Sequence, residues 1–140
     1  MDYNKFLEIF SESEILENKI SIKSNLREAI LFVKGNYNFD ILMEIIGNHK
    51  DENHIELIYH MFSSINQEDL FISISTEKNI ETVSDIFPSS IFDEDEIYDL
   101  FGVNFIGHKD LKRLYMPNSW KGHPLRKDYV QDDERLSWND

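Results

Sequence analysis

Histidine is the residue type in this chain with the widest chemical range, because imidazole binds metal ions and transfers protons near neutral pH. The chain has five histidines. His54 and His60 lie along one predicted extended segment, where a rise of ~3.3 Å per residue separates them by about 20 Å, too far to share an ion. His108, Asp110 and His123 come together only if the end of the chain folds back on itself. A freestanding small metal-dependent enzyme that uses these three residues is kept as an alternative hypothesis.

Carboxylates are concentrated at the start of a predicted helix, in Glu94, Asp95 and Glu96, with Asp99 one turn later. Glu96 and Asp99 are three residues apart and therefore share a helix face. Carboxylates serve as catalytic acid and base when burial separates their pKa values, whereas acids near a helix start also suit the positive end of the helix dipole. We expect the simpler arrangement, a solvated helix N-terminus.

The lack of cysteine and the scatter of glycine exclude several classes of function. The 140 residues contain no cysteine, so iron-sulfur clusters, thiolate zinc sites and cysteine nucleophiles have no ligand here. The five glycines are scattered singly, which leaves no glycine-rich loop to bind a phosphate. No stretch approaches the ~18 consecutive apolar residues of a membrane-spanning helix, and the first residues lack the pattern of a signal peptide. The expected location is the cytosol or its side of a membrane.

The net charge of −13 hides a basic segment. Residues 1–104 carry 7 Lys and Arg against 21 Asp and Glu, whereas residues 105–129 carry 6 against 2, a local charge of +4. Aromatic and apolar side chains are interleaved in the basic segment without regular periodicity. Arginine and aromatic residues are enriched in the cores of protein interfaces, while the acidic remainder of the chain opposes nucleic acid. The predicted target is a protein partner with acidic grooves.

The hydrophobic pattern predicts an α+β fold. Period-two alternation over 39–46, 55–62 and 70–75 indicates three strands in an antiparallel meander, and residues 15–23 suggest a fourth strand. Apolar spacing predicts helices over 3–10, 25–35, 80–87 and 91–101, with a capping box from Asn25 to Glu28 and helix ends at Gly35 and Gly102. The expected domain, residues 1–104, is an antiparallel sheet of three to four strands covered on one face by helices. An irregular extended C-terminal arm, residues 105–140, is expected to pack on a partner subunit.

Three motifs between residues 94 and 129 occur in an order that is typical of one protein family. The first is EDEIYDLFG starting at Glu94, the second is GHKDLKR starting at Gly107, and the third is GHPLRKDY ending at Tyr129. Together they resemble the signature of the C subunit of proton-pumping NADH-quinone oxidoreductase (respiratory complex I), the family of the 30-kDa subunit of the respiratory chain. The chain departs from the family pattern at Asp95, where the family has arginine, and at Lys109, where it has proline.

The resemblance implies a non-catalytic structural subunit of the hydrophilic arm of that enzyme, which as a complex transfers electrons from NADH to quinone. Such a protein has no cofactor of its own, since NADH, FMN, the iron-sulfur clusters and quinone belong to other subunits. Its partners would be the large quinone-site subunit, of the D type, and neighbouring iron-sulfur subunits. It would lie on the cytoplasmic side of the cell membrane, which it reaches only through the complex. Related subunits of membrane-bound nickel-iron hydrogenases leave an equivalent role there as an alternative.

The resemblance and the composition of the arm together predict a partner interface. Its charged members Arg113, Arg126, Lys127 and Asp128 are expected to make charge-assisted contacts, either to acidic partner groups or within the arm. The predicted interface residues are Glu94, Glu96, Tyr98, Asp99, His108, Asp110, Arg113, Trp120, His123, Pro124, Leu125, Arg126, Lys127, Asp128 and Tyr129.

Overall fold

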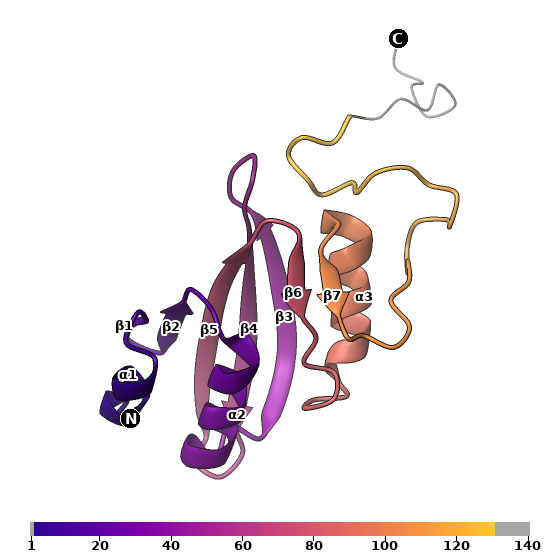
Figure 1. Cartoon of the computed structure of the whole chain (residues 1–140). Coiled ribbons are helices and arrows are strands. Elements are labelled where there is room, and N and C mark those ends of the chain that lie inside the picture. Colours follow the sequence, from indigo (N-terminus) through magenta and orange to yellow (C-terminus); the bar gives the residue numbers. More distant parts are fainter. Residues whose placement is uncertain (1, 131–140) are drawn as a thin grey trace.

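A five-stranded sheet forms the centre of the computed structural model, which describes residues 2–130 (Figure 1). Its three long strands are β3 (Ile41–His49), β4 (Ile55–Ser63) and β5 (Glu68–Thr76), paired antiparallel as the sequence predicts. Two short strands, β1 (Glu14–Leu16) and β2 (Lys19–Ile22), extend the sheet in the order β1-β2-β5-β4-β3. Because β2 runs parallel to β5, the sheet is mixed and has one strand more than expected.

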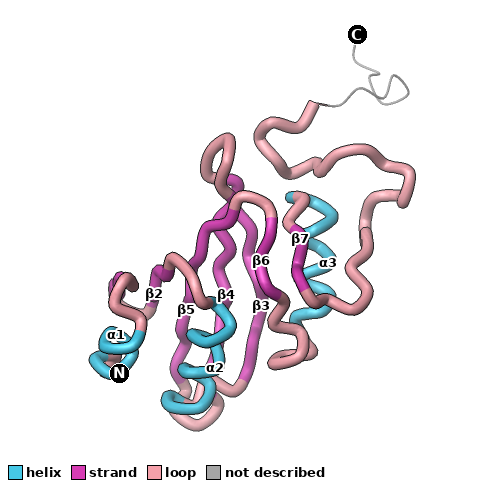
Figure 2. The backbone as a smooth tube through the Cα atoms, in the orientation of Figure 1, coloured by secondary structure: helices cyan, strands magenta, loops and turns pink. Residues whose placement is uncertain are grey.

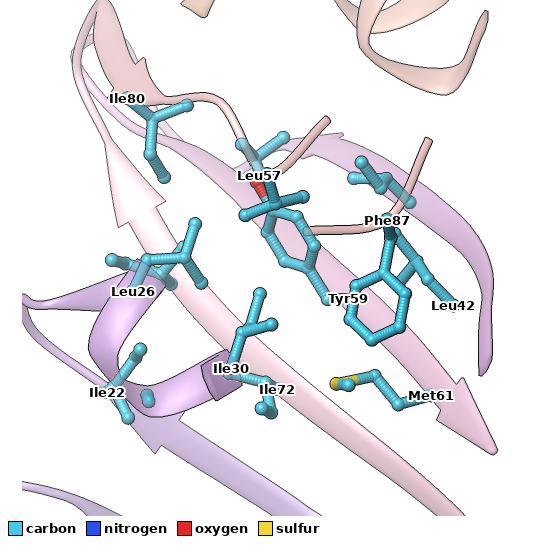
Figure 3. Close-up of a cluster of buried hydrophobic side chains, with 14 of the residues drawn as sticks. Ile22, Leu26, Ile30, Leu42, Leu57, Tyr59, Met61, Ile72, Ile80 and Phe87 are labelled. Carbon is cyan, nitrogen blue, oxygen red and sulfur yellow. The ribbon is translucent and has the colours of Figure 1, made fainter. Parts of the chain in front are cut away.

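The main core lies between one face of this sheet and helix α2 (Leu26–Tyr37). The alternation predicted for β4 is confirmed, since Leu57, Tyr59 and Met61 are all fully buried. Figure 3 shows them on the same side of the sheet as Leu26 of α2. Helix α1 (Asn4–Ile9) adds Phe6 to the same cluster. The α+β class and the helical cover of one face are therefore confirmed.

Helix α3 (Ser90–Phe101) packs beside β3, the edge strand of the main sheet (Figure 1). The contact is close at Gly47 of β3, where an added Cβ would lie 2.8 Å from both Ile97 Cδ1 and Phe101 Cε2. Two short strands, β6 (Asn79–Glu81) and β7 (Asn104–Ile106), pair in parallel as a second sheet. From residue 107 to residue 130 the chain has no helix or strand, and from here on this segment is called the arm (Figure 2). The arm predicted from the sequence begins at residue 105, inside β7, and its residues 131–140 lie outside the part of the chain that the structure describes.

The predicted helix over residues 80–87 is wrong. Ile80, Val83 and Phe87 are buried at helix-like spacing, but Ile80 belongs to β6 and turns follow it. A strand pairing with β7, which lies more than twenty residues later, decides the conformation here. The pairing also means that the predicted domain boundary between residues 104 and 105 falls inside β7.

Three local details of the prediction also differ from the structure. Helix α2 does not end at Gly35 but continues to Tyr37, and Asn38 closes it in a left-handed conformation. The capping box is not formed, because Asn25 has φ 59° and its side chain makes no cap hydrogen bond. In β3 a bulge between Leu42 and Glu44 shifts the register, so the alternation expected from Ile41 does not hold.

Candidate functional site: the anchored C-terminal arm

The arm is held on α3 chiefly by the carboxylate of Asp99. Asp99 Oδ2 accepts hydrogen bonds from three successive backbone amides, those of Leu114 at 3.2 Å, Tyr115 at 2.7 Å and Met116 at 3.1 Å. Asp99 Oδ1 lies 3.0 Å from Nη1 of the Arg113 guanidinium. Asp99 is 0% exposed, so these donors replace the water that the carboxylate would otherwise bind.

Two opposing influences set the pKa of Asp99. Burial is the largest single influence and raises the pKa, but hydrogen bonds from Tyr115, Met116, Arg113 and Leu114 together outweigh it and hold the pKa below its ordinary value. Asp99 is therefore a carboxylate at neutral pH, and its negative charge strengthens each of the bonds that fix the arm.

The GHPLRKDY segment covers the C-terminal end of α3, where the last helical carbonyls have no partner within the helix. The Leu100 carbonyl accepts the Leu125 amide at 2.9 Å, and the Phe101 carbonyl accepts the Arg126 guanidinium at 3.3 Å. A positive charge at this position also suits the negative end of the helix dipole. The Arg126 guanidinium also donates to the Asp128 carboxylate, from Nε at 2.9 Å and from Nη2 at 3.1 Å.

Gly102 ends α3 as predicted, and its conformation gives room to His123. Gly102 has φ 78°, and a Cβ added there would lie 2.6 Å from His123 Cδ2. His123 Nδ1 lies 2.9 Å from the Asp99 carbonyl oxygen. The first and third motifs therefore meet at the end of α3, and Figure 1 shows the arm rising beside the helix and passing over this end.

A further contact joins the arm to the main sheet. The Lys127 amide donates to Nδ1 of His49, the last residue of β3, at 2.6 Å. His49 is 2% exposed. His49 is a member of the site that was not predicted, because 78 residues separate it from Lys127 and no local pattern signals the contact.

The acidic start of α3 is buried, so the prediction of a solvated helix N-terminus is wrong. Glu94 and Asp95 are at most 1% exposed. The Glu94 carboxylate accepts the Thr82 hydroxyl at 2.5 Å and the Val83 amide at 2.9 Å, which ties the turn after β6 to the helix. Burial, the largest influence, raises the pKa of Glu94 in spite of these hydrogen bonds. Nearby Tyr59 is also fully buried, and burial followed by the charge of Glu94 raises its pKa well above the ordinary value.

Asp95 fixes the base of the arm. Its Oδ1 accepts the Lys112 amide at 3.1 Å and lies 3.6 Å from Nε2 of His108, whose side chain is 2% exposed. Leu111, between these two residues, packs against the hydrophobic core. At a position where the family pattern has arginine, this chain places a carboxylate that binds a backbone amide.

The remaining predicted interface residues lie in the outer layers of the site. Asp110, Leu125, Lys127 and Asp128 are exposed, and Glu96, Tyr98, Trp120, Pro124 and Tyr129 are half-buried. Exposed apolar side chains accompany them along the arm, at Leu114, Tyr115 and Val130. The arm thus binds α3 through backbone amides and arginines, while these apolar side chains are exposed next to charged ones such as Lys121 and Lys127.

Neither a metal site nor a membrane span is found in the part of the chain that the structure describes. Between residues 2 and 130 no three His, Asp or Glu side chains are placed to hold one metal ion, so His108, Asp110 and His123 do not form the site that a metal-dependent enzyme requires. Helices long and apolar enough to cross a bilayer are also missing from these residues. The buried carboxylates are instead occupied by amide, hydroxyl and guanidinium donors, which is the arrangement of a structural anchor.

Comparison with known proteins gives a consistent result. The family model described as respiratory-chain NADH dehydrogenase, 30 Kd subunit, matches residues 20–135. The C/D subunit of NADH-quinone oxidoreductase from Phocaeicola vulgatus is 34% identical over 116 residues, which are 80% of this chain and 22% of that protein. The proteins of the same name from Bacteroides fragilis and Escherichia coli are 43% and 41% identical over 76 residues, and these cover 14% and 13% of their lengths.

The matched part of this chain spans between 13% and 22% of the length of the C/D proteins named above. The family match nevertheless covers the three long strands of the main sheet and the anchored arm, including all three motifs that meet at or near α3. The chain belongs to the family of the 30-kDa subunit of respiratory-chain NADH dehydrogenase.

Proposed function

We propose that this chain is a non-catalytic structural subunit of the hydrophilic arm of a proton-pumping NADH-quinone oxidoreductase. It docks onto the large quinone-site subunit, of the D type, and onto neighbouring iron-sulfur subunits, and it holds them in position. NADH, FMN, the iron-sulfur clusters and quinone are bound by those other subunits. The chain is peripheral, on the cytoplasmic side of the membrane.

The observation that carries this proposal is that the arm is fixed on α3 and yet exposes apolar side chains. Its backbone amides and arginines bind Asp99 and the helix carbonyls, whereas Tyr115, Leu125 and Val130 are 62%, 52% and 81% exposed. Apolar side chains presented on a segment that is itself held in place indicate a protein interface, because little conformational entropy is lost when the partner binds. The names of the relatives support the NADH-quinone assembly over the hydrogenase alternative. These relatives are named as combined C/D subunits, which supports a D-type partner.

The proposal is tested by placing charges on the outer side of the arm. In the double variant Tyr115→Asp and Leu125→Asp we expect the chain to fold but to be lost from the complex purified from native membranes, because a charge without a partner is costly in a buried interface. The matched control is Leu31→Asp on α2, where the wild-type side chain is 49% exposed. Native gels and NADH-quinone activity of the membranes report assembly. Full assembly and activity in the double variant would contradict the proposal.

A further inference from the structure

The face of the main sheet directed away from α2 is apolar although no described element covers it. We call this the open face. Cross-strand pairing places Ile46 beside Ile58, His60 beside Phe71 and Ile41 beside Phe62. These residues alternate along β4 with the core residues Leu57, Tyr59 and Met61, so they project to the opposite side. None of the five apolar residues Ile41, Ile46, Ile58, Phe62 and Phe71 belongs to the buried core or packs against it.

An antiparallel sheet with one solvated face normally carries polar residues on that face. Here Ile41 and Ile46 are 39% and 40% exposed on the edge strand β3, and Ile58, Phe62 and Phe71 are half-buried in the central strands. The His60 ring stacks on Phe71 with a centroid distance of 4.4 Å, which extends the flat apolar area across β4 and β5. Apolar side chains that recur on one face of three strands, with Glu44 and His60 between them, indicate a surface that a partner covers.

The three long strands of the open face carry charges of one sign. Strands β3, β4 and β5 contain no lysine or arginine. Glu44 and Asp69 lie on either side of His60, 3.8 Å and 2.8 Å from its ring nitrogens, and their side chains are 54% and 50% exposed. The third acid of this face, Glu56, is compensated by Lys50 at 2.8 Å and by Lys19 of β2 at 4.0 Å, and Lys19 is the cross-strand neighbour of Phe71. The potential next to the apolar area is therefore negative around Glu44 and Asp69, which are exposed enough to receive further donors.

We propose that the open face is a second docking surface, and that its occupant is a segment of a neighbouring subunit that places Lys or Arg around apolar side chains. The apolar residues would pack against Ile46, Ile58 and Phe71, and the basic residues would meet Glu44 and Asp69. A second copy of this face would bring like charges together, and anionic lipid or nucleic acid would be repelled. The inference rests on the proposed role in a complex, but it uses a surface that shares no residue with the arm.

The test is site-specific photo-crosslinking of the full chain in cells that assemble the native complex. A photoreactive amino acid replaces Ile46 on the open face, Tyr115 on the arm, or Leu31 on α2 as the control position. We expect position 46 to crosslink to a Lys- or Arg-containing segment of another subunit, identified by mass spectrometry, and position 31 to give no crosslink. Adding Glu44→Lys should lower the yield at position 46 by about fivefold, the upper end of the effect of an exposed ion pair. Glu28→Lys, a charge reversal on α2, should leave it unchanged.

Several outcomes would overturn the inference. Crosslinking at position 115 but not at position 46 would reject the open face and leave the proposed function standing, whereas failure at both positions, with no co-purifying subunits, would reject the proposed function itself. Crosslinks from position 46 to a second copy, to lipid, or to residues 131–140 of the same chain would also reject the inference. A yield that Glu44→Lys does not change would remove the electrostatic part of the argument. Circular dichroism of each variant, compared with wild type, separates these results from misfolding.

Discussion

Asp99 and Glu94 lie in the same helix and respond to pH in opposite directions. The pKa of Asp99 is lowered in the folded chain, so its contribution to stability is present above the ordinary Asp pKa of about 3.9 and is lost as pH falls through the lower folded value. The pKa of Glu94 is raised, so its contribution is present at low pH and is lost as pH rises through the folded value. Acid therefore weakens the attachment of the arm, whereas protonation of Glu94 relieves the cost of burying its charge.

We expect Asp99→Asn to lower the free energy of unfolding at pH 7 by about 3 kcal/mol, because the variant breaks a buried ion pair and weakens three hydrogen bonds from backbone amides. The difference between wild type and variant should shrink as pH falls below about 4, since protonation of Asp99 removes the same charge from wild type. Urea unfolding at pH 7 and at pH 3 measures both values. The control Asp110→Asn removes a carboxylate that is 79% exposed and should change stability by less than about 0.5 kcal/mol. A pH-independent difference for Asp99→Asn would contradict this account.

Motifs identified the residues of the site but not their chemistry. Asp99, Arg113 and His123 were all expected at an interface, and the structure brings them together at the end of α3 within the chain. Whether they also touch a partner stays a prediction. The buried state of Glu94 could not be read from its neighbours, because an acidic run looks alike on a solvated and on a buried helix start, and the donors come from Thr82 and Val83 in another segment.

At the level of elements, Gly47 and Gly35 separate two roles of glycine. Gly47→Ala would place a Cβ 2.8 Å from Ile97 and Phe101, so α3 would have to move away from β3. We expect the free energy of unfolding to fall by about 1–3 kcal/mol, as for other overpacked cores. Gly35→Ala, in α2 with no atom within 4 Å of the added Cβ, should raise it by about 0.5–1 kcal/mol through helix propensity. Thermal unfolding of both variants checks this, and equal effects of the two would refute the close packing of α3.

The elements that the sequence predicts well are those whose burial follows a local period. Strands β4 and β5 alternate regularly, and α3 has a glycine stop, so all three were found close to their observed bounds. Strands β6 and β7 are three residues long and exist through their mutual pairing, which no local pattern encodes. The same holds for the bulge in β3, since only the register with β4 reveals which residue is inserted.

For the whole molecule, the predicted domain boundary after residue 104 can be tested with shortened chains. A chain cut after Asn104 loses Phe105, which is 3% exposed, and the pairing of β7 with β6. A chain cut after Lys112 keeps both, together with the hydrogen bond from the Lys112 amide to the Asp95 carboxylate. We expect the first to unfold at a clearly lower temperature than the second, because losing a buried Phe side chain costs about 3–5 kcal/mol. Equal melting temperatures would show that β7 does not support the domain.

The charge partition of the sequence also takes a more definite form in three dimensions. The basic residues Arg113 and Arg126 meet Asp99 and the carbonyl end of α3, so part of the local +4 is used inside the chain. Composition alone could not show this, because it does not reveal which acids lie within reach. What remains for the proposed partners is the exposed part of the arm, with its apolar side chains and four exposed lysines (Lys109, Lys112, Lys121 and Lys127), and the open face of the main sheet.

The Asp99 carboxylate accepts hydrogen bonds from main-chain amides, so the side chains of those residues take no part in the attachment. Every residue except proline offers the same N–H group, so positions 114 and 115 can exchange almost any side chain without releasing the arm. Leu114 and Tyr115 are both exposed to solvent, where the proposed partner would contact them. With such an attachment, the exposed side chains of the arm can be substituted as the sequence of a partner changes, while the path of the backbone stays constant.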